Sequence, residues 1–104
     1  MTTANAMRGE ASFRVGREEI LLRPSFAALT AAEEELGPLF ALVERAADGR
    51  LGLGEMASLF FHCAAARPEG VTRERIGEAI AETGLAKATP VLRVLLTQIL
   101  QGRV

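Results

Sequence analysis

The sequence has a single cysteine and no long apolar run, so it lacks the residues for disulfide bonds or for a membrane-spanning helix. It has one cysteine in 104 residues, so no internal disulfide bond can form, which is typical of a reducing compartment. No apolar run approaches the roughly 20 residues that a helix needs to cross a bilayer. The opening residues, MTTANAM, lack the basic start and the apolar region of a secretory signal. These absences predict a globular protein of the cytoplasm.

The charges are nearly balanced, with a formal net charge of -1 at pH 7. This balance provides no general attraction to nucleic acid or to anionic lipid. A length of 104 residues is that of one domain. We expect residues 1–7 to form a disordered tail and residues 8–104 to form a single domain. Within it we expect a β-hairpin over residues 8–23 and a helical part over residues 25–101.

Apolar and polar side chains alternate over residues 8–23, on either side of a Gly-Arg loop at residues 16–17. A two-residue loop with glycine first is typical of a type II′ hairpin turn, and it fixes the register. The predicted pairs are Val15 with Glu18, Phe13 with Ile20, Ala11 with Leu22, Arg14 with Glu19 and Glu10 with Arg23. Apolar pairs thus fall on one face and opposite charges on the other, as cross-strand packing favours. An isolated hairpin is marginally stable, so we expect its apolar face to pack on helices.

Two successive helix signals occupy residues 22–50. Ser25 can cap the first helix, and Gly37 suits its end in the left-handed conformation. Pro38 suits the first turn of the second helix, which ends at the Asp-Gly turn of residues 48–49. The apolar positions at helical spacing are Phe26, Leu29, Ala32 and Leu36, then Leu39, Leu42, Val43 and Ala46. We therefore expect a sharp corner that brings two apolar faces together.

Three further helices are predicted. Turn residues at 67–70 end the third, while Thr72 caps the fourth, which ends at Gly84. The last lies between about residues 86 and 101, and the sequence leaves open whether Pro90 stands at its opening or in its first turn. The positions expected in the core are Met56, Leu59, Phe60, Cys63, Ile76, Ala79, Ile80, Leu92, Leu95 and Ile99. The predicted fold class is α+β, mainly α, with an N-terminal β-hairpin packed on a compact bundle of four to five short helices.

The residues that could carry chemistry do not form a recognisable site. His62 and Cys63 are the only residues of their kinds, and neighbours on a helix point about 100° apart, so they cannot easily share a substrate or a metal ion. We expect Cys63 in the core and His62 at its boundary. Arg67, Arg73 and Arg75 form a small basic cluster without interleaved aromatic residues, which gives little support for a nucleic-acid site. The sequence therefore predicts no catalytic, metal-binding or cofactor-binding residues.

Two stretches could contact a partner protein. Glu33, Glu34 and Glu35 form a carboxylate run, which is either a solvated face or a docking site for a basic partner. The last helix has apolar residues on more than one face, although a surface helix needs a stripe of only roughly 100°. It is either a central, enclosed helix or one with an exposed strip that binds a partner or a second copy. Leu96 and Leu100 lie on its outer flank, so Leu96, Leu100, Glu33 and Glu34 are the candidate partner-binding residues.

A series of short motifs follows in a recognisable order over nearly the whole chain after residue 7. A Gly-Glu pair opens a short alternating hairpin, a Leu-Arg pair follows, and A-L-x-x-x-E-x-x-L-G comes next. The matching residues are Arg8, Gly9, Glu10, Leu22, Arg23, Ala28, Leu29, Glu33, Leu36 and Gly37. The later apolar helix and the closing leucine-rich helix also fall in the expected places. In these features the chain resembles the small tail proteins of gene transfer agents and related phages, a family also described as phage tail assembly chaperones.

The resemblance implies a non-enzymatic role in building a phage-like tail, in a gene transfer agent or a prophage. It implies action with the tape-measure protein, or with another tail assembly protein, while the tail tube polymerises. It implies no catalytic residue. The sequence itself predicts no cofactor and no nucleic-acid or membrane partner, and it leaves a homo-oligomer open. The alternative from a different class is a small cytoplasmic regulatory or antitoxin-like protein-binding module. A small enzyme is least supported, since the sequence suggests no concave site with perturbed titratable groups.

Overall fold

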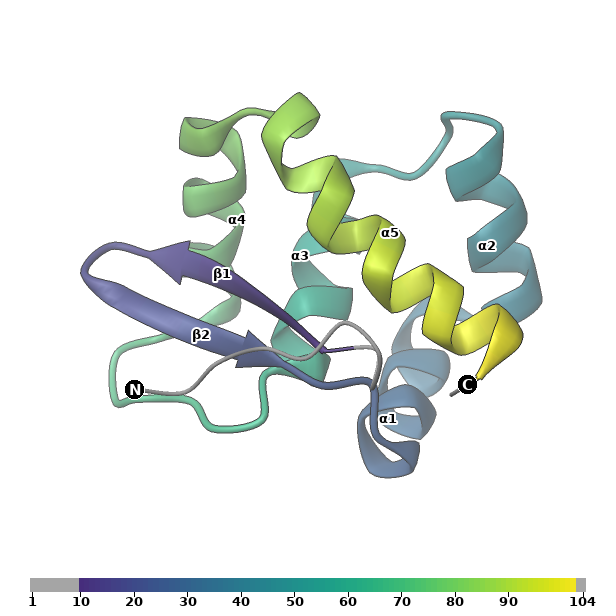
Figure 1. Cartoon of the computed structure of the whole chain (residues 1–104), viewed down its shortest axis with the longest axis horizontal. Coiled ribbons are helices and arrows are strands. Elements are labelled where there is room, and N and C mark those ends of the chain that lie inside the picture. Colours follow the sequence, from purple (N-terminus) through teal and green to yellow (C-terminus); the bar gives the residue numbers. More distant parts are fainter. Residues whose placement is uncertain (1–9, 103–104) are drawn as a thin grey trace.

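The computed structural model describes residues 10–102. In this part of the chain, two strands are followed by five helices (Figure 1). The elements are β1 (Ala11–Val15), β2 (Glu18–Leu22), α1 (Phe26–Leu36), α2 (Leu39–Ala47), α3 (Leu53–Cys63), α4 (Arg73–Thr83) and α5 (Leu85–Gln101). This arrangement confirms the predicted α+β, mainly α fold with its N-terminal hairpin. The predicted disordered tail at residues 1–7, and residues 8–9 and 103–104 of the predicted domain, lie outside the described residues.

The two strands form an antiparallel hairpin in the predicted register, with Phe13 opposite Ile20. Gly16 has a φ of 64°, and no non-glycine residue in the range 10–102 has a positive φ, so Arg17 does not. A type I′ turn would need positive φ at both loop residues, so this turn agrees with the predicted type II′. The apolar face packs on α3, where the rings of Phe13 and Phe60 meet edge to face with their centroids 5.3 Å apart.

The polar side of the hairpin carries the predicted charge pairs. Arg14 and Glu19 lie 3.7 Å apart and are both exposed, so their contribution is at most about 1 kcal/mol. Arg23 Nε donates to Glu10 Oε2 over 2.7 Å, and Glu10 is only 4% exposed. A buried carboxylate is costly without a partner, so this second pair ties the start of β1 to the end of β2.

A sharp corner joins α1 to α2, as predicted. Ser25 Oγ caps α1 by accepting from a backbone N–H of its first turn, and Gly37, with a φ of 91°, ends it. Pro38 precedes α2 as its N-cap with an extended ψ of 135°, one position before the predicted one. The Glu33 carboxylate supplies the cap that proline lacks, since its Oε2 accepts from the Leu39 N–H over 3.1 Å.

Helix α3 lies at the centre of the molecule and packs against both α1 and α4. It is buried continuously over residues 56–60 and again at Cys63, which confirms all of its predicted core positions. The helix ends at Cys63, however, before the predicted end at residues 67–70. Beyond it, the Ala65 N–H donates to the Leu21 carbonyl of β2 over 2.9 Å. The chain leaves the helix early because its backbone pairs with the hairpin.

Helix α5 begins at Leu85, directly after Gly84, which ends α4 with a φ of 96°. Pro90 lies in the second turn, so both predicted placements of this proline are wrong. The first turn is already closed, because the N–H groups of Lys87 and Ala88 donate to the Gly84 carbonyl. Ala88 is fully buried, so packing holds this turn although Pro90 has no N–H to donate.

One hydrophobic core joins the hairpin to the helices. Helix α4 contributes its predicted core residues and is capped as predicted, since the Thr72 hydroxyl accepts from a backbone N–H of the first turn. The largest fully buried side chains are Phe60, Ile20, Leu22, Leu42, Leu59, Ile76, Ile80, Leu95 and Cys63. They come from β2, α2, α3, α4 and α5, so the hairpin and helices stabilise one another.

Helix α5 is not the enclosed helix of the bundle. It runs diagonally across the face shown in Figure 1, with the hairpin on one side and α2 on the other. It buries Ala88, Leu92 and Leu95 on one side only. Ile99, predicted to be core, is only partly buried, and Phe26 at the start of α1 is 85% exposed, so both expectations are wrong. The structure therefore favours the alternative in which α5 keeps apolar surface exposed.

Candidate protein-binding groove

An apolar groove lies between α2 and α5. Its first part is formed by the start of α2 and the end of α5, and is lined by Glu33, Pro38, Leu39, Phe40, Val43, Ile99 and Leu100. Its second part is formed by the end of α2 and the middle of α5, and is lined by Val43, Ala46, Ala47, Thr89, Leu92, Arg93 and Leu96. Because Val43 lines both parts, we treat them as one surface, the α2–α5 groove.

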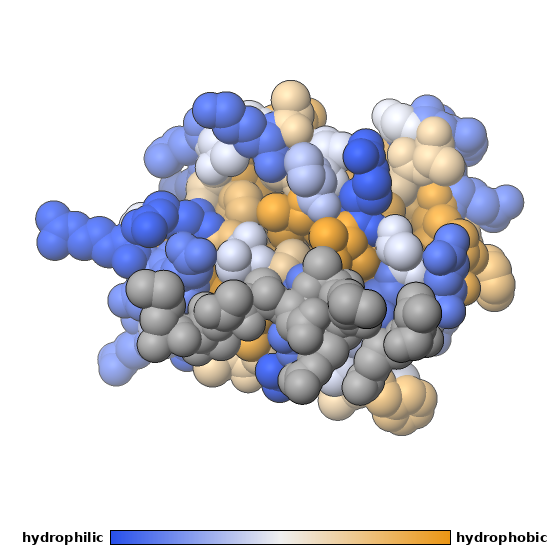
Figure 2. All heavy atoms as spheres, in the orientation of Figure 1, coloured by the Kyte–Doolittle hydropathy of each residue, from blue (hydrophilic) through white to orange (hydrophobic). Residues whose placement is uncertain are grey.

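Large apolar side chains are exposed on this groove. Phe40 is 75% exposed and Leu100 is 53% exposed. Figure 2 shows hydrophobic atoms along the course of α5 and on the side of α2, whereas hydrophilic atoms cover the tip of the hairpin. Single exposed apolar residues are normal, but neighbouring ones that line a groove are typical of a protein interaction site.

The structure brings together three of the four predicted partner-binding residues. Leu100 and Glu33 line the first part of the α2–α5 groove, and Leu96, which is half-buried, lines the second part. Glu34 is exposed on α1 and lines neither part. Consecutive helix residues point about 100° apart, so Glu33 can face the groove while Glu34 faces solvent.

Phe40 is the groove residue that the sequence analysis missed. The predicted apolar stripe of α2 runs through Leu39 and Val43, and Phe40 falls beyond its edge, about 100° from Leu39. It therefore stays in solvent while Leu42, on the stripe, is fully buried. A large aromatic residue beside the buried stripe of a helix was the signal available in the sequence.

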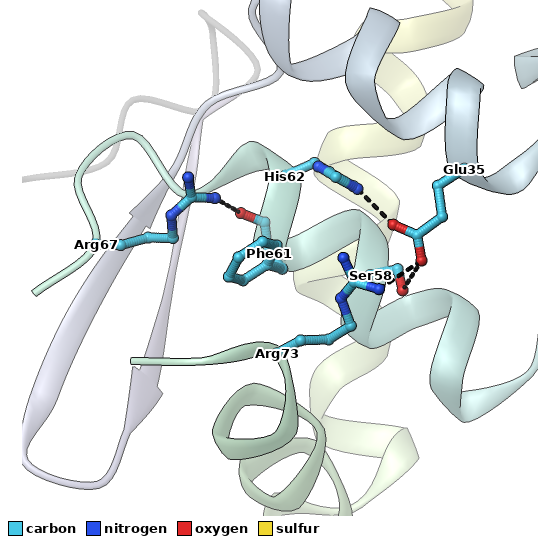
Figure 3. Close-up of polar contacts among 6 residues, drawn as sticks. All are labelled: Glu35, Ser58, Phe61, His62, Arg67 and Arg73. Carbon is cyan, nitrogen blue, oxygen red and sulfur yellow. Dashed lines mark hydrogen bonds and ion pairs between the residues drawn. The ribbon is translucent and has the colours of Figure 1, made fainter. Parts of the chain in front are cut away.

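A polar cluster holds α1 against α3 and α4 (Figure 3). Glu35 Oε1 lies 2.7 Å from His62 Nε2, and its Oε2 accepts from Arg73 over 2.7 Å and from the Ser58 hydroxyl over 2.9 Å. The hydrogen bond from His62 is the main cause that holds the pKa of Glu35 below its ordinary value of 4.5; Ser58 and Arg73 also lower it, while burial acts in the opposite direction. The predicted solvated carboxylate face therefore does not include Glu35. Its spacing of three residues from the buried Ala32 was the missed signal.

Two guanidinium groups pack on the ring of Phe61, as Figure 3 shows. Arg67 Cζ lies 4.2 Å and Arg73 Cζ 5.2 Å from the ring centroid, and Arg67 also donates to the Phe61 carbonyl over 2.9 Å. Arg75 lies instead beside the hairpin turn, close to Gly16. The predicted basic cluster is therefore divided, and the aromatic residue that the sequence pattern lacked comes from α3. Cation–π packing is a structural use of Arg67 and Arg73.

His62 and Cys63 occupy the predicted boundary and core positions. Cys63 is 1% exposed, and burial raises the pKa of its thiol to about 12. The thiol is therefore protonated at neutral pH and is a poor nucleophile. Within residues 10–102, no group of three or more His, Cys, Asp and Glu side chains could hold a metal ion. No helix in that range is long and apolar enough to cross a membrane.

A match to a known family extends over residues 8–102, a range that includes both strands and all the described helices. The family is described as "Phage tail tube protein, GTA-gp10". Neither the curated proteins nor the solved structures include a match to this chain. The family match confirms the resemblance to tail proteins of gene transfer agents and phages. The chain belongs to the phage tail tube protein family GTA-gp10.

Proposed function

We propose that the protein is a non-enzymatic tail assembly chaperone, which acts with the tape-measure protein while the tail tube forms in a gene transfer agent or prophage. Membership of a tail protein family supplies the context. The observation that supports the finer role is the α2–α5 groove, an exposed apolar surface on a domain that also has a buried hydrophobic core. Such a surface suits a partner that is held for a time and then released.

A chaperone role is favoured over a place in the tube wall. Subunits of a tube make head-to-tail contacts, so each needs two different complementary surfaces. The groove is one such surface. Within residues 10–102, the other exposed large apolar residues are Phe26, Leu53 and Leu85, which occupy the first positions of three different helices, α1, α3 and α5. This distribution supports one docking surface rather than two.

The groove could protect a tape-measure segment before the tube encloses it. An apolar segment that is exposed before assembly promotes aggregation. Burial of Phe40 and Leu100 against such a segment would remove apolar surface of both proteins from water. Displacement by tube subunits would then release the chaperone. The polar cluster around Glu35 joins α1, α3 and α4 and is not part of the groove lining.

Co-expression with the tape-measure protein of the same gene cluster tests this proposal. The wild-type protein should co-elute with the tape-measure protein and increase its soluble fraction. Leu96→Glu should reduce co-elution at least tenfold, because it replaces an apolar contact in the groove lining with a charged side chain that is costly to bury. Leu53→Glu is the matched control, since Leu53 is 43% exposed and lies outside the groove, and it should bind normally. Thermal melting of each variant alone checks that it is folded. If Leu96→Glu does not fold, Phe40→Ala is tested in its place with the same expected result.

Two results would contradict the proposal. One is a wild-type protein that neither binds nor solubilises the tape-measure protein. The other comes from purified particles analysed by quantitative mass spectrometry. If the chain were present there in the same copy number as a tube subunit, it would be a wall component and not a chaperone.

A further inference from the structure

The two ends of the α2–α5 groove carry opposite charges. Glu33 lines the end formed by the start of α2, where its Oε2 accepts from the Leu39 N–H. Arg93 lines the other end, beside the last residues of α2; it is exposed and has no hydrogen-bond or ionic partner among residues 10–102. The lining between these two charges is almost entirely apolar. The α2–α5 groove is therefore apolar along its length, with an acidic end and a basic end.

The length of the groove and its position between two helices suit a short helix. It follows α2, which has nine residues and is therefore about 13 Å long. About two and a half turns of a second helix would fill that length. A groove between two helices is complementary to a ridge, which the apolar stripe of a third helix provides. A two-fold contact between copies of this chain would instead place groove against groove.

An extended segment would fit this surface poorly. Its backbone N–H and C=O groups need partners, and a strand obtains them by pairing with the edge of a sheet. The lining of the groove is apolar side chains on two helices, whose backbones are already hydrogen-bonded internally. A helix satisfies its own backbone and needs only apolar contact, so it is the form of chain that the groove accommodates.

We propose that the α2–α5 groove binds an amphipathic helix of the partner protein in one direction, with its N-terminus at Glu33 and its C-terminus at Arg93. Helix N-termini carry partial positive charge and C-termini partial negative charge, so this orientation pairs both ends favourably. The bound helix runs parallel to α2 and antiparallel to α5. It carries apolar anchors at i, i+3, i+4 and i+7. Basic residues flank it on the N-terminal side and acidic residues on the C-terminal side, outside the helical turns, where they face Glu33 and Arg93 without opposing the helix dipole. The inference rests on the proposed tail function for its partner, and on the groove for everything else.

Overlapping 20-residue peptides that cover the tape-measure protein test this inference by fluorescence anisotropy. Peptides that bind should have the anchor spacing, with basic residues first and acidic residues last, and they should become helical by circular dichroism. Glu33→Gln should weaken their binding about two- to fivefold, since it removes the charge but keeps an acceptor for the Leu39 N–H. Arg93→Glu should weaken it more, and Glu44→Gln, at an exposed α2 position outside the lining, should leave it unchanged.

Photo-crosslinking reads the direction of the bound helix. A crosslinker in the first turn of a binding peptide should label residues 38–40 or 99–100, and one in the last turn should label residues 89–93. Labelling in the reverse order, or binding that ignores the Glu33 and Arg93 substitutions, would overturn the inference. So would binding of the intact tape-measure protein without binding of any peptide, and this result would leave the proposed function standing. If neither peptide nor intact protein binds, the proposed function fails and the inference fails with it.

Discussion

Glu35→Gln is expected to lower the free energy of unfolding by about 1 kcal/mol at neutral pH. The substitution keeps the shape of the side chain and an acceptor for Ser58, but it removes the charge that faces Arg73 and His62. Fully buried hydrogen bonds to charged groups contribute about 1.5–3 kcal/mol each. Here the Glu35 and Arg73 side chains are 33% and 41% exposed, so solvent weakens their interaction. Each contact of the carboxylate is then closer to the roughly 0.2–1 kcal/mol of an exposed ion pair. The contacts with Arg73 and His62 together contribute on the order of 1 kcal/mol.

The same substitution should reduce the response of stability to acid. The pKa of Glu35 in the folded protein lies below its ordinary value of 4.5, so the unfolded chain binds this proton more readily. The carboxylate therefore stabilises the fold above pH 4.5, and this stabilisation is lost as the pH falls below 4.5 through the lowered pKa. The difference in unfolding free energy between wild type and Glu35→Gln should be largest near neutral pH and should shrink in acid.

Thermal and urea unfolding at neutral and acidic pH measure both effects. A loss of about 1 kcal/mol corresponds to a fall in Tm of roughly 4–8 °C for a domain of this size. Glu34→Gln is the matched control, because Glu34 is exposed and has no side-chain partner within residues 10–102; its effect should stay within about 0.5 kcal/mol. If Glu35→Gln changes stability no more than Glu34→Gln, or equally at every pH, the polar cluster does not stabilise the fold through charge.

Cys63→Ala should lower the free energy of unfolding by about 1 kcal/mol or somewhat more, because packing is lost. Burial raises the pKa of the native thiol to about 12, so it should alkylate slowly at neutral pH. Rapid alkylation of the folded protein would contradict the core position of Cys63. Leu95→Ala should cost roughly 2–5 kcal/mol in urea unfolding, while Leu100→Ala, at a half-exposed position, should change stability by less than about 0.5 kcal/mol. Phe13→Ala should cost about 3–5 kcal/mol, because its ring packs on Phe60, and a loss near zero would refute the docking of the hairpin on α3.

Local sequence signals were sufficient where neighbours in the chain decide the structure. The two-residue loop fixed the hairpin register, because a slip by one residue would move Phe13 and Ile20 to the polar face. The spacing of Met56, Leu59 and Cys63 placed the core face of α3 correctly. Side-chain caps marked the starts of α1 and α4 in the same way, since a cap depends only on residues a few positions apart.

Contacts between distant residues account for what the sequence did not show. The early end of α3 depends on the hydrogen bond from Ala65 to Leu21, which lie 44 positions apart (65 - 21). The partners of Glu35 are 23, 27 and 38 positions away, so the carboxylate run looked solvated. Pro90 enters the second turn of α5 because a first turn forms upstream around a buried alanine, which proline preferences alone do not reveal.

Of the two walls of the groove, only the one formed by α5 could be predicted from the sequence. The angles of Leu96 and Leu100 on α5 placed them on an outer flank, and both line the groove. The opposite wall comes from α2, and no local pattern states that residue 40 lies across from residue 100. Phe40 was therefore missed, although its position outside the apolar stripe of α2 already indicated exposure.

The affinity of the purified tape-measure protein for two phenylalanine variants tests the central claim most directly. Phe40 and Phe26 are both highly exposed, at 75% and 85%, so Phe40→Ala and Phe26→Ala should leave the fold equally intact. Only Phe40 lines the α2–α5 groove. Isothermal titration calorimetry should show at least tenfold weaker binding for Phe40→Ala, as for an aromatic anchor at an interface, and a change of less than about twofold for Phe26→Ala. Equal effects of the two substitutions, or a loss with Phe26→Ala alone, would show that the groove is not where the partner binds.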